Sequence, residues 1–392
     1  MQSAELQNRD FHNILLIKLS ALGDIVHTLP LLHKLRRRYA AARIDWLVAP
    51  AFAELLALNP AIDRVIEFER DRWEQPWRAA PYVAAVRLIA RLRAARYDLV
   101  LDLQGQMRSA AFAFACGAPV RIGFDRPRAD RWRALTRSVP DEAKKHAWQG
   151  ARELSWLAYT RHIAVPSLDS HPVDRLLGVA PMLGLDDGAP DFSFPIPPEA
   201  VTRIEALLDY YDIAKAKLIV IAPATNWDTK QWRRDGFAEL ARHCLAKGAA
   251  VVLIGSPAER ALCEEVARLA PGTIDLAGET TLPELAALIR RAAVCVSNDS
   301  GPMHLAVALD RPVVSVFGPT DPVWAGPYRR DGAAVRAGVA CSPCYLRKLS
   351  DCRHHHACMR DVAAGKVIER VDAALAKASG KAATPSRSTG RR

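Results

Sequence analysis

The chain has 392 residues, of which 50% are hydrophobic and 25% are charged, so it is not intrinsically disordered and is long enough for two or three domains. Its formal net charge of +11 indicates acidic partners, such as nucleic acid, anionic lipid headgroups or phosphorylated substrates. No apolar run reaches the roughly 18 residues that span a bilayer, and residues 1–13 lack the apolar region of a signal peptide, so we expect a cytoplasmic protein.

The first half alternates short apolar segments with helical segments, as parallel sheets do. We expect strands at residues 14–17, 44–48 and 99–103 and helices at residues 24–39 and 87–95. Residues 18–23 form a loop between the first strand and the first helix. Pro30 should kink or interrupt that helix, because proline lacks a backbone N–H.

The second half repeats this alternation, with strands expected at residues 218–222, 250–254, 294–297 and 313–317. Thr281 and Glu284 form a capping box that starts one of its helices. We therefore predict two doubly wound α/β domains, residues 1–189 and 199–361, joined by a proline-rich linker at 190–198. A C-terminal helix should follow at 362–376, and the basic, acid-free residues 377–392 should form a disordered tail. Ligands of such sheets bind beyond the carboxyl ends of the strands, so we expect a site in a cleft between facing domains.

The strand expected at 294–297 leads directly into Asp299, Ser300 and Gly301, with His304 one helical turn later. Small residues at a strand-to-helix turn let backbone N–H groups approach an anion, and the helix dipole attracts it. The same residues are also ordinary helix-capping residues. The turn is therefore a candidate phosphate site.

Two further loops of the second half carry polar residues after predicted strands. Thr225 and Lys230 lie in the first of these loops, where lysine could neutralise a diphosphate; the alternative is a solvated loop lysine. Glu259 follows the next strand and is placed either to accept hydrogen bonds from a ribose or to favour a helix start. Neither G-x-G-x-x-G, nor a P-loop motif, nor an Asp-x-Asp pair for a divalent ion occurs in the sequence.

In the first half, Asp24 lies just past the expected first strand. A carboxylate at this edge of a sheet is able to act as general base on a hydroxyl nucleophile. The alternative is that Asp24 only caps the helix that begins there.

Four cysteines lie close together near the C-terminus: Cys341, Cys344, Cys352 and Cys358, with three histidines at 354–356. The spacing of the first pair suits zinc, but the remaining intervals fit no standard zinc ribbon. A structural metal site therefore stays open as an alternative to free thiols, and no catalytic metal is predicted.

Several of these motifs, in this order and spacing, resemble those of glycosyltransferase family 9, the lipopolysaccharide heptosyltransferases. The resemblance covers roughly residues 14–371. Its motifs are KLSALGDIVHTLP at 18–30, DLQG at 102–105 with Arg108 and Ser109, the loop at 225–230, Asp299-Ser300-Gly301 with His304, and FGPTDP at 317–322. Many relatives have threonine in place of Ser300, and both residues carry a hydroxyl.

The resemblance implies a GT-B fold and an inverting transfer of heptose from ADP-L-glycero-D-manno-heptose to the Kdo/heptose inner core of lipopolysaccharide, without metal or cofactor. By motif, Asp24 corresponds to the catalytic base and Lys18 to a supporting lysine. The donor site would comprise Thr225, Lys230, Glu259, Asp299, Ser300, Gly301 and His304.

The implied acceptor, lipid A with Kdo, carries carboxylates and phosphates. We therefore assign it to the basic residues of the first domain, Arg108, Arg121, Arg126, Arg128, Lys144 and Lys145, although each is also compatible with a solvated surface. Excess basicity suits a peripheral enzyme on the anionic inner face of the inner membrane. The alternatives are another GT-B transferase or epimerase that uses a different nucleotide sugar, or a basic nucleic-acid-binding protein with a Cys/His metal site. No nucleic-acid-binding module is recognisable, so we expect no nucleic-acid partner.

Overall fold

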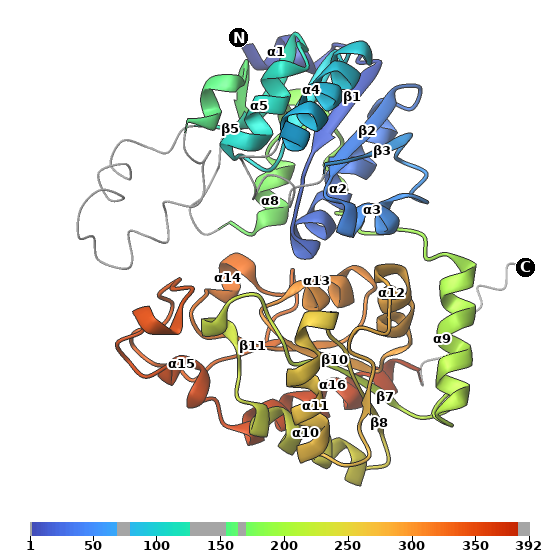
Figure 1. Ribbon diagram of the computed structural model, residues 1–392, viewed down its shortest axis with the longest axis vertical. Coiled ribbons are helices and arrows are strands. Elements are labelled where there is room, and N and C mark those ends of the chain that lie inside the picture. Colours follow the sequence, from blue (N-terminus) through green and yellow to red (C-terminus); the bar gives the residue numbers. More distant parts are fainter. Residues whose placement is uncertain (1, 69–78, 126–153, 164–169, 383–392) are drawn as a thin grey trace, which may run out of the picture. The chain divides into compact units, whose positions relative to one another are not determined.

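The computed structural model describes residues 2–68, 79–125, 154–163 and 170–382. The chain divides into two compact units, Met1–Pro197 and Pro198–Arg392. The described part of each unit contains a six-stranded sheet in which every paired strand is parallel, with helices packed on both faces (Figure 1). This confirms the expected α/β class and the two doubly wound sheets.

The sheet of the first unit has the strand order β3-β2-β1-β4-β5-β6. Its strands are β1 (Asn13–Ile17), β2 (Arg43–Val48), β3 (Arg64–Glu67), β4 (Leu99–Asp102), β5 (Val120–Phe124) and β6 (Arg161–Ile163). Its helices are α1 (Gln2–Gln7), α2 (Leu22–Arg38), α3 (Pro50–Leu56), α4 (Ala79–Ala94), α5 (Met107–Ala115) and α8 (Pro172–Leu177), with short 3-10 turns η2 (Ser155–Ala158) and η3 (Ala180–Leu183).

Alternation along β1 explains the two layers of this unit. Ile14 and Leu16 belong to one buried cluster, which also contains Leu29 of α2. Leu15 and Ile17 belong to the cluster on the other face, which includes Phe112 of α5. Because successive strand residues point to opposite faces, a strand that is apolar throughout must be covered on both sides.

The second unit has the strand order β12-β11-β10-β7-β8-β9. Its strands are β7 (Leu218–Ala222), β8 (Ala250–Leu253), β9 (Ile274–Asp275), β10 (Val294–Asn298), β11 (Val313–Val316) and β12 (Ala334–Val335). Its longer helices are α9 (Pro198–Tyr210), α10 (Arg234–Ala246), α11 (Arg260–Leu269), α12 (Leu282–Arg291), α13 (Gly301–Ala308) and α16 (Ala364–Ala382). Its short helices and 3-10 turns are η4 (Asp228–Lys230), η5 (Pro257–Glu259), α14 (Pro322–Ala325), η6 (Leu349–Asp351) and α15 (Ala357–Arg360).

The helices of the second unit also form two layers. α12 packs against α9 and α13, whereas α10 packs against α11 and α16. The layer of α10 encloses Ile219 and Ile221 of β7 together with Val367 and Val371 of α16. The capping box predicted at Thr281 and Glu284 starts α12, as expected.

Three expectations differ from the structure. Helix α2 begins at Leu22, two residues early, and runs through Pro30 without interruption, because the packing of its buried residues on both sides of Pro30 outweighs the one backbone hydrogen bond that proline cannot donate. Helix α4 spans Ala79–Ala94, so it begins eight residues before the helix expected at 87–95. Helix α16 continues to Ala382, since the alanines and lysines after residue 376 are good helix formers, so the tail predicted from residue 377 is helical over its first six residues. Among the described residues, no helix is long and apolar enough to cross a membrane.

Candidate functional site

Both sheets have the same topology, and this places a ligand crevice in each unit. If the strands are numbered within their own unit, both sheets have the order 3-2-1-4-5-6. The connections that follow the two central strands therefore run towards opposite sides of the sheet: β1 and β4 in the first unit, β7 and β10 in the second. Ligands of open α/β sheets bind at this point, beyond the carboxyl ends of the strands. Residues 18–24 and 103–108 follow β1 and β4, and residues 223–233 and 299–304 follow β7 and β10. Apart from Glu259 and the basic residues beyond 108, the predicted site residues all lie in these four segments.

Asp24 lies in the first turn of α2, three residues after the N-cap Ala21. Its Oδ2 accepts a hydrogen bond from the backbone N–H of Ala21 (3.3 Å), so it does cap the helix. Its Oδ1 is 3.6 Å from the ammonium of Lys18, which is buried and donates to the carbonyl of Leu103 (2.9 Å). The Asp24 side chain remains 43% exposed. The carboxylate is therefore oriented by its neighbours and open to a substrate.

The DLQG segment at the end of β4, residues 102–105, supports the loop that precedes the helix of Asp24. Asp102 is fully buried, and its Oδ1 accepts hydrogen bonds from the N–H groups of Gln104 and Gly105. Its Oδ2 accepts a hydrogen bond from the hydroxyl of Tyr159 (2.8 Å). Burial raises the pKa of Asp102 and of Tyr159 above their ordinary values. Asp102 and Tyr159 thus form a buried network that fixes the backbone at Gln104, and the sequence signal for it was the acid that ends an apolar strand.

The basic residues predicted for the acceptor are only partly described. Arg108 is exposed in the first turn of α5, at the carboxyl end of β4. Arg121 lies in β5, and its guanidinium donates to the carbonyls of Ala118 and Ala158, so the structure gives it a local role away from the Asp24 loop. The other four lie outside the described residues: Arg126, Arg128, Lys144 and Lys145.

In the second unit, Asn298 at the end of β10 holds the loop that follows β7. Its side-chain oxygen accepts a hydrogen bond from the N–H of Trp232 (3.0 Å), and its amide donates to the carbonyl of Pro223 (2.7 Å). Trp232 is fully buried and donates from its indole to the carbonyl of Val362. These contacts anchor both ends of the loop. Sequence reasoning missed Asn298 because it looked like part of the strand.

Lys230 and Asp299 form a buried ion pair at this point. The Lys230 ammonium is 2.7 Å from Asp299 Oδ2, and the two side chains are 15% and 5% exposed. The same oxygen accepts a hydrogen bond from the buried hydroxyl of Thr320 (2.7 Å), a residue not predicted for the site. The ammonium also lies 4.3 Å from the ring centre of Trp227, a cation–π contact. Lys230 is thus held in place by Asp299 and Trp227, and Thr320 in turn holds Asp299.

The start of α13 has the features of an anion site. The Ser300 hydroxyl is buried and makes no hydrogen bond with any residue that the structure describes. Gly301 is the first helical residue, and His304 is buried on the same helix. The Thr225 hydroxyl donates to the carbonyl of Asp299 (3.4 Å), which ties the two loops together. The structure therefore brings five of the predicted donor residues to one place: Thr225, Lys230, Asp299, Ser300 and Gly301.

Glu259 lies one strand further along, in η5 after β8. Its Oε2 accepts hydrogen bonds from the backbone N–H and the hydroxyl of Ser256 (2.7 and 2.9 Å). The carboxylate therefore caps its own turn, as the structural alternative expected, and is still partly exposed.

The cysteine-rich segment packs onto the β7 loop. The Thr229 hydroxyl donates to the carbonyl of Leu346, and a ring nitrogen of His356 lies 2.7 Å from the carbonyl of Thr229. The guanidinium of Arg347 lies 4.6 Å from the ring centre of Trp227. All eight cysteines are free thiols, and in the described part of the chain no three His, Cys, Asp or Glu side chains are arranged to hold a metal ion. The segment therefore supports the β7 loop through direct contacts.

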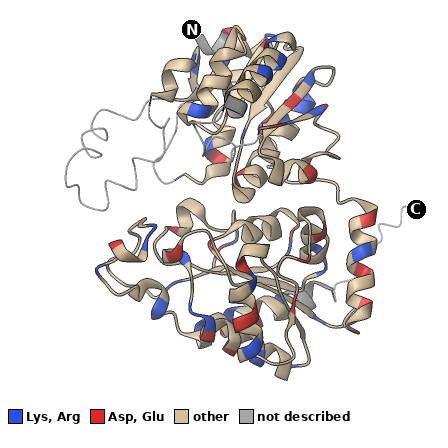
Figure 2. Cartoon of the chain, viewed as in Figure 1, with Lys and Arg blue, Asp and Glu red and all other residues tan. Residues whose placement is uncertain are grey.

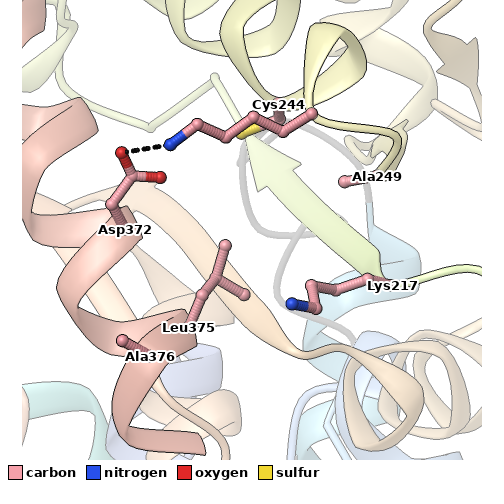
Figure 3. A pocket seen from close by; sticks show the side chains of 7 residues that line it. Lys217, Cys244, Ala249, Asp372, Leu375 and Ala376 are labelled. Atoms are coloured by element: carbon pink, nitrogen blue, oxygen red, sulfur yellow. Dashed lines mark hydrogen bonds and ion pairs between the residues drawn. The ribbon is translucent and has the colours of Figure 1, made fainter. Parts of the chain in front are cut away.

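A pocket in the second unit lies at the other end of the strands from the Lys230 loop. Lys217 and Ala249, which precede β7 and β8, line it together with Cys244 and Asp372 (Figure 3). Asp372 bonds Lys247 at 2.8 Å, and burial followed by the Asp372 charge raises the pKa of Cys244 to about 11. This pocket lies at the amino ends of the strands and is separate from the Lys230 loop.

Acidic and basic residues occur along the same helices in the described part of the chain, α9 among them (Figure 2). Glu199, Arg203 and Glu205 of α9 are an example. This pattern does not favour a nucleic-acid-binding surface among the described residues.

Comparison with known proteins agrees with this geometry. The model of glycosyltransferase family 9 (heptosyltransferase) matches residues 85–154 and 134–353. The chain is 33% identical to lipopolysaccharide heptosyltransferase 1 of Pseudomonas aeruginosa over 84% of this chain and 85% of that protein. It is 31% identical to lipopolysaccharide heptosyltransferase 1 of Escherichia coli K12, over 83% of this chain and 93% of that protein.

Two solved structures share the whole architecture. One is a family 9 glycosyltransferase from Veillonella parvula, with a TM-score of 0.74, 21% identity and coverage of 96% of this chain and 100% of that chain. The other is E. coli heptosyltransferase WaaC with ADP-2-deoxy-2-fluoro heptose, with a TM-score of 0.67, 26% identity and coverage of 92% and 99%. These similarities confirm the expected GT-B fold class. The chain belongs to glycosyltransferase family 9, the heptosyltransferases, and is a glycosyltransferase.

Proposed function

We propose that this enzyme transfers heptose from ADP-L-glycero-D-manno-heptose to the Kdo/heptose inner core of lipopolysaccharide, by an inverting mechanism that needs no metal. The family, the relatives named lipopolysaccharide heptosyltransferase 1, and the similarity to a structure that holds an ADP-heptose analogue support the substrate class. The single observation that carries the proposal is the arrangement of Lys230, Asp299 and Ser300 at the β7/β10 crevice.

The second unit would bind the donor. A diphosphate at the start of α13 would meet the backbone N–H groups from Gly301 onward and the hydroxyl of Ser300, which has no hydrogen-bond partner among the described residues. The Lys230 ammonium would neutralise the charge that develops on the leaving ADP, a role that a divalent ion has in other transferases. Thr225 and His304 would shape this pocket, and Glu259 would accept hydrogen bonds from the nucleoside.

The first unit would bind the acceptor. Asp24 would take the proton from an acceptor hydroxyl as that oxygen attacks the anomeric carbon of heptose. Lys18, whose ammonium lies 3.6 Å from Asp24, would hold the carboxylate in place for this step. Inversion follows from a single displacement, because the nucleophile enters opposite to the departing diphosphate.

Anionic groups of the acceptor would meet Arg108, which is exposed beside the Asp24 loop. The proposed acceptor site also includes four basic residues on the basis of their charge alone: Arg126, Arg128, Lys144 and Lys145. The lipid portion of the acceptor implies that the enzyme works in the cytoplasm at the anionic inner face of the inner membrane, and the net charge of +11 supports this attachment.

Donor and acceptor are tested together by a transfer assay. Purified enzyme is incubated with ADP-heptose and either Kdo₂-lipid A or the same acceptor that already bears one heptose, in the presence of EDTA. We expect transfer to one of these acceptors, with inhibition by ADP at concentrations where UDP has little effect. Equal inhibition by ADP and UDP, or transfer only after a divalent ion is added, would contradict the proposed donor or the metal-independent mechanism.

A further inference from the structure

Gln104 is held in an unusual way at the β1/β4 crevice. Its side-chain oxygen accepts hydrogen bonds from the backbone N–H groups of Leu19 (3.1 Å) and Ser20 (3.4 Å). Both donors belong to the loop that joins β1 to the helix of Asp24. The side chain thus crosses from the β4 loop to the β1 loop, which leads into the helix that carries Asp24.

These two bonds determine which end of the amide faces which way. Because a backbone N–H can only donate, the oxygen of Gln104 must face the loop, and the NH₂ group must face away from it. The backbone beneath the side chain is fixed as well, since the N–H groups of Gln104 and Gly105 both donate to the buried Asp102. The amide is therefore rigid, although the residue itself is only half-buried.

The NH₂ group makes no hydrogen bond with any residue in the described part of the structure, and it is not among the buried polar atoms that lack a partner. It is therefore a solvent-accessible pair of donors at the point where a ligand of this sheet binds. An oriented donor that has no partner among the described residues, in the crevice that also holds the half-exposed carboxylate of Asp24, is suited to contact a substrate.

We propose that Gln104 binds the acceptor: its NH₂ group donates to a hydroxyl or carboxylate oxygen of the acceptor sugar next to the hydroxyl that Asp24 deprotonates. The acceptor class that this recognises is a sugar acid, whose carboxylate accepts strong hydrogen bonds. Gln104 would at the same time position the Asp24 loop through its oxygen. These two roles belong to opposite ends of one amide, so they are separable by substitution.

Gln104→Glu is the informative variant. A glutamate has the same shape and keeps an oxygen for the N–H groups of Leu19 and Ser20, but it replaces the NH₂ donor with a second, negatively charged oxygen. Gln104→Met removes both functions. If Gln104 only positions the loop, Gln104→Glu keeps wild-type acceptor affinity and Gln104→Met lowers kcat.

We expect Gln104→Glu to weaken acceptor binding by about tenfold to a hundredfold, the effect of losing a hydrogen bond to a charged group. The KM for ADP-heptose and the affinity for ADP should remain within about twofold of the wild-type values. Gln106→Glu is the matched control, because it introduces the same charge two residues away, at the N-cap of α5, where the Gln106 side chain makes no capping hydrogen bond. It should change acceptor affinity by less than about threefold.

Acceptor affinity is measured twice, as the KM in the transfer assay and by direct titration of Kdo₂-lipid A into the enzyme without donor. Because the role of Gln104 rests on the proposed function, the second measurement keeps the two separate. Binding without transfer overturns the proposed reaction and still tests Gln104. Unchanged acceptor affinity in Gln104→Glu, an equal loss in Gln106→Glu, or no acceptor binding by the wild-type enzyme would overturn the role of Gln104.

Discussion

Replacing Asp299 with asparagine separates two roles of this residue in the donor crevice: its charge, which pairs with Lys230, and its oxygen, which accepts hydrogen bonds. The carboxylate is 5% exposed, and its Oδ2 accepts both the Lys230 ammonium and the Thr320 hydroxyl at 2.7 Å. Asparagine is able to offer one oxygen at the same place, so both hydrogen bonds survive while the charge of Lys230 loses its partner. Breaking a buried ion pair from one side costs about 3–5 kcal/mol.

The lower end of that range applies here, because Lys230 is 15% exposed and keeps its contact with Trp227. We therefore expect Asp299→Asn to lower the free energy of unfolding by about 3 kcal/mol. For a domain of this size, about 2–4 °C is lost per kcal/mol, so the Tm should fall by roughly 6–12 °C. Differential scanning calorimetry of the wild-type and variant proteins, each with and without ADP, measures both effects.

ADP at about a hundred times its Kd should stabilise both proteins by about 2.7 kcal/mol, since the freed Lys230 still faces the diphosphate. Asp228→Asn is the control, because it removes the same charge from an exposed position in the same loop. It should change the free energy of unfolding by less than about 0.5 kcal/mol. A Tm fall below 2 °C in Asp299→Asn would refute the buried pair, and loss of stabilisation by ADP would show that Asp299 itself contacts the nucleotide.

Three further results are expected. Thr320→Val should reduce kcat/KM for ADP-heptose about tenfold, because Asp299 of the Lys230 pair loses one hydrogen bond, and Thr320→Ser should keep the wild-type value. Steady-state kinetics measure both variants, and a serine variant as slow as the valine variant would show that Thr320 only packs. Hydrogen bonds from Arg37 and Lys34 lower the pKa of Asp186 to about 2, so this acid stabilises the fold above the ordinary carboxyl pKa and loses that effect as the pH falls towards 2. Asp186→Asn should therefore cost about 1 kcal/mol at pH 7, after allowance for screening of a 40% exposed side chain, and almost nothing near pH 2, as urea unfolding at the two pH values will test. A thiol reagent at pH 7.5 should label the partly exposed Cys341, Cys344 and Cys352 well before the five buried cysteines. Burial raises the pKa of Cys295 to about 12, so rapid labelling of Cys295 would contradict its buried position.

The order of elements was predictable because apolar runs bounded by polar loops have few other interpretations. The strand at 218–222 has the predicted bounds, and those at 250–253 and 294–298 differ by one residue. The end of α16 was not predictable, because alanine and lysine are common both in exposed helices and in disordered tails. Strand order could not be read from the sequence either, since it depends on which strands pair in space.

The site was only partly predictable for a similar reason. Lys230 and Asp299 were each identified from their positions after strands, but their mutual ion pair joins residues 69 positions apart and has no local signal. Gln104 and Thr320 lie in motifs that the sequence singled out, but like Asn298 they act through hydrogen bonds to other loops, so the sequence did not assign them a role in the site. Arg121 was predicted from its charge alone, and the structure uses it to bind nearby carbonyl groups.

The most direct test of the account compares heptose transfer by the wild-type enzyme and by Asp24→Asn, with ADP binding measured on the same preparations. Asparagine keeps the size of the side chain and an oxygen for the Ala21 N–H, but it cannot accept the proton of a nucleophile. We expect a rate lower by about 10² to 10⁴ with unchanged ADP affinity. A variant that transfers heptose at nearly the wild-type rate would contradict the assignment of Asp24 as the base.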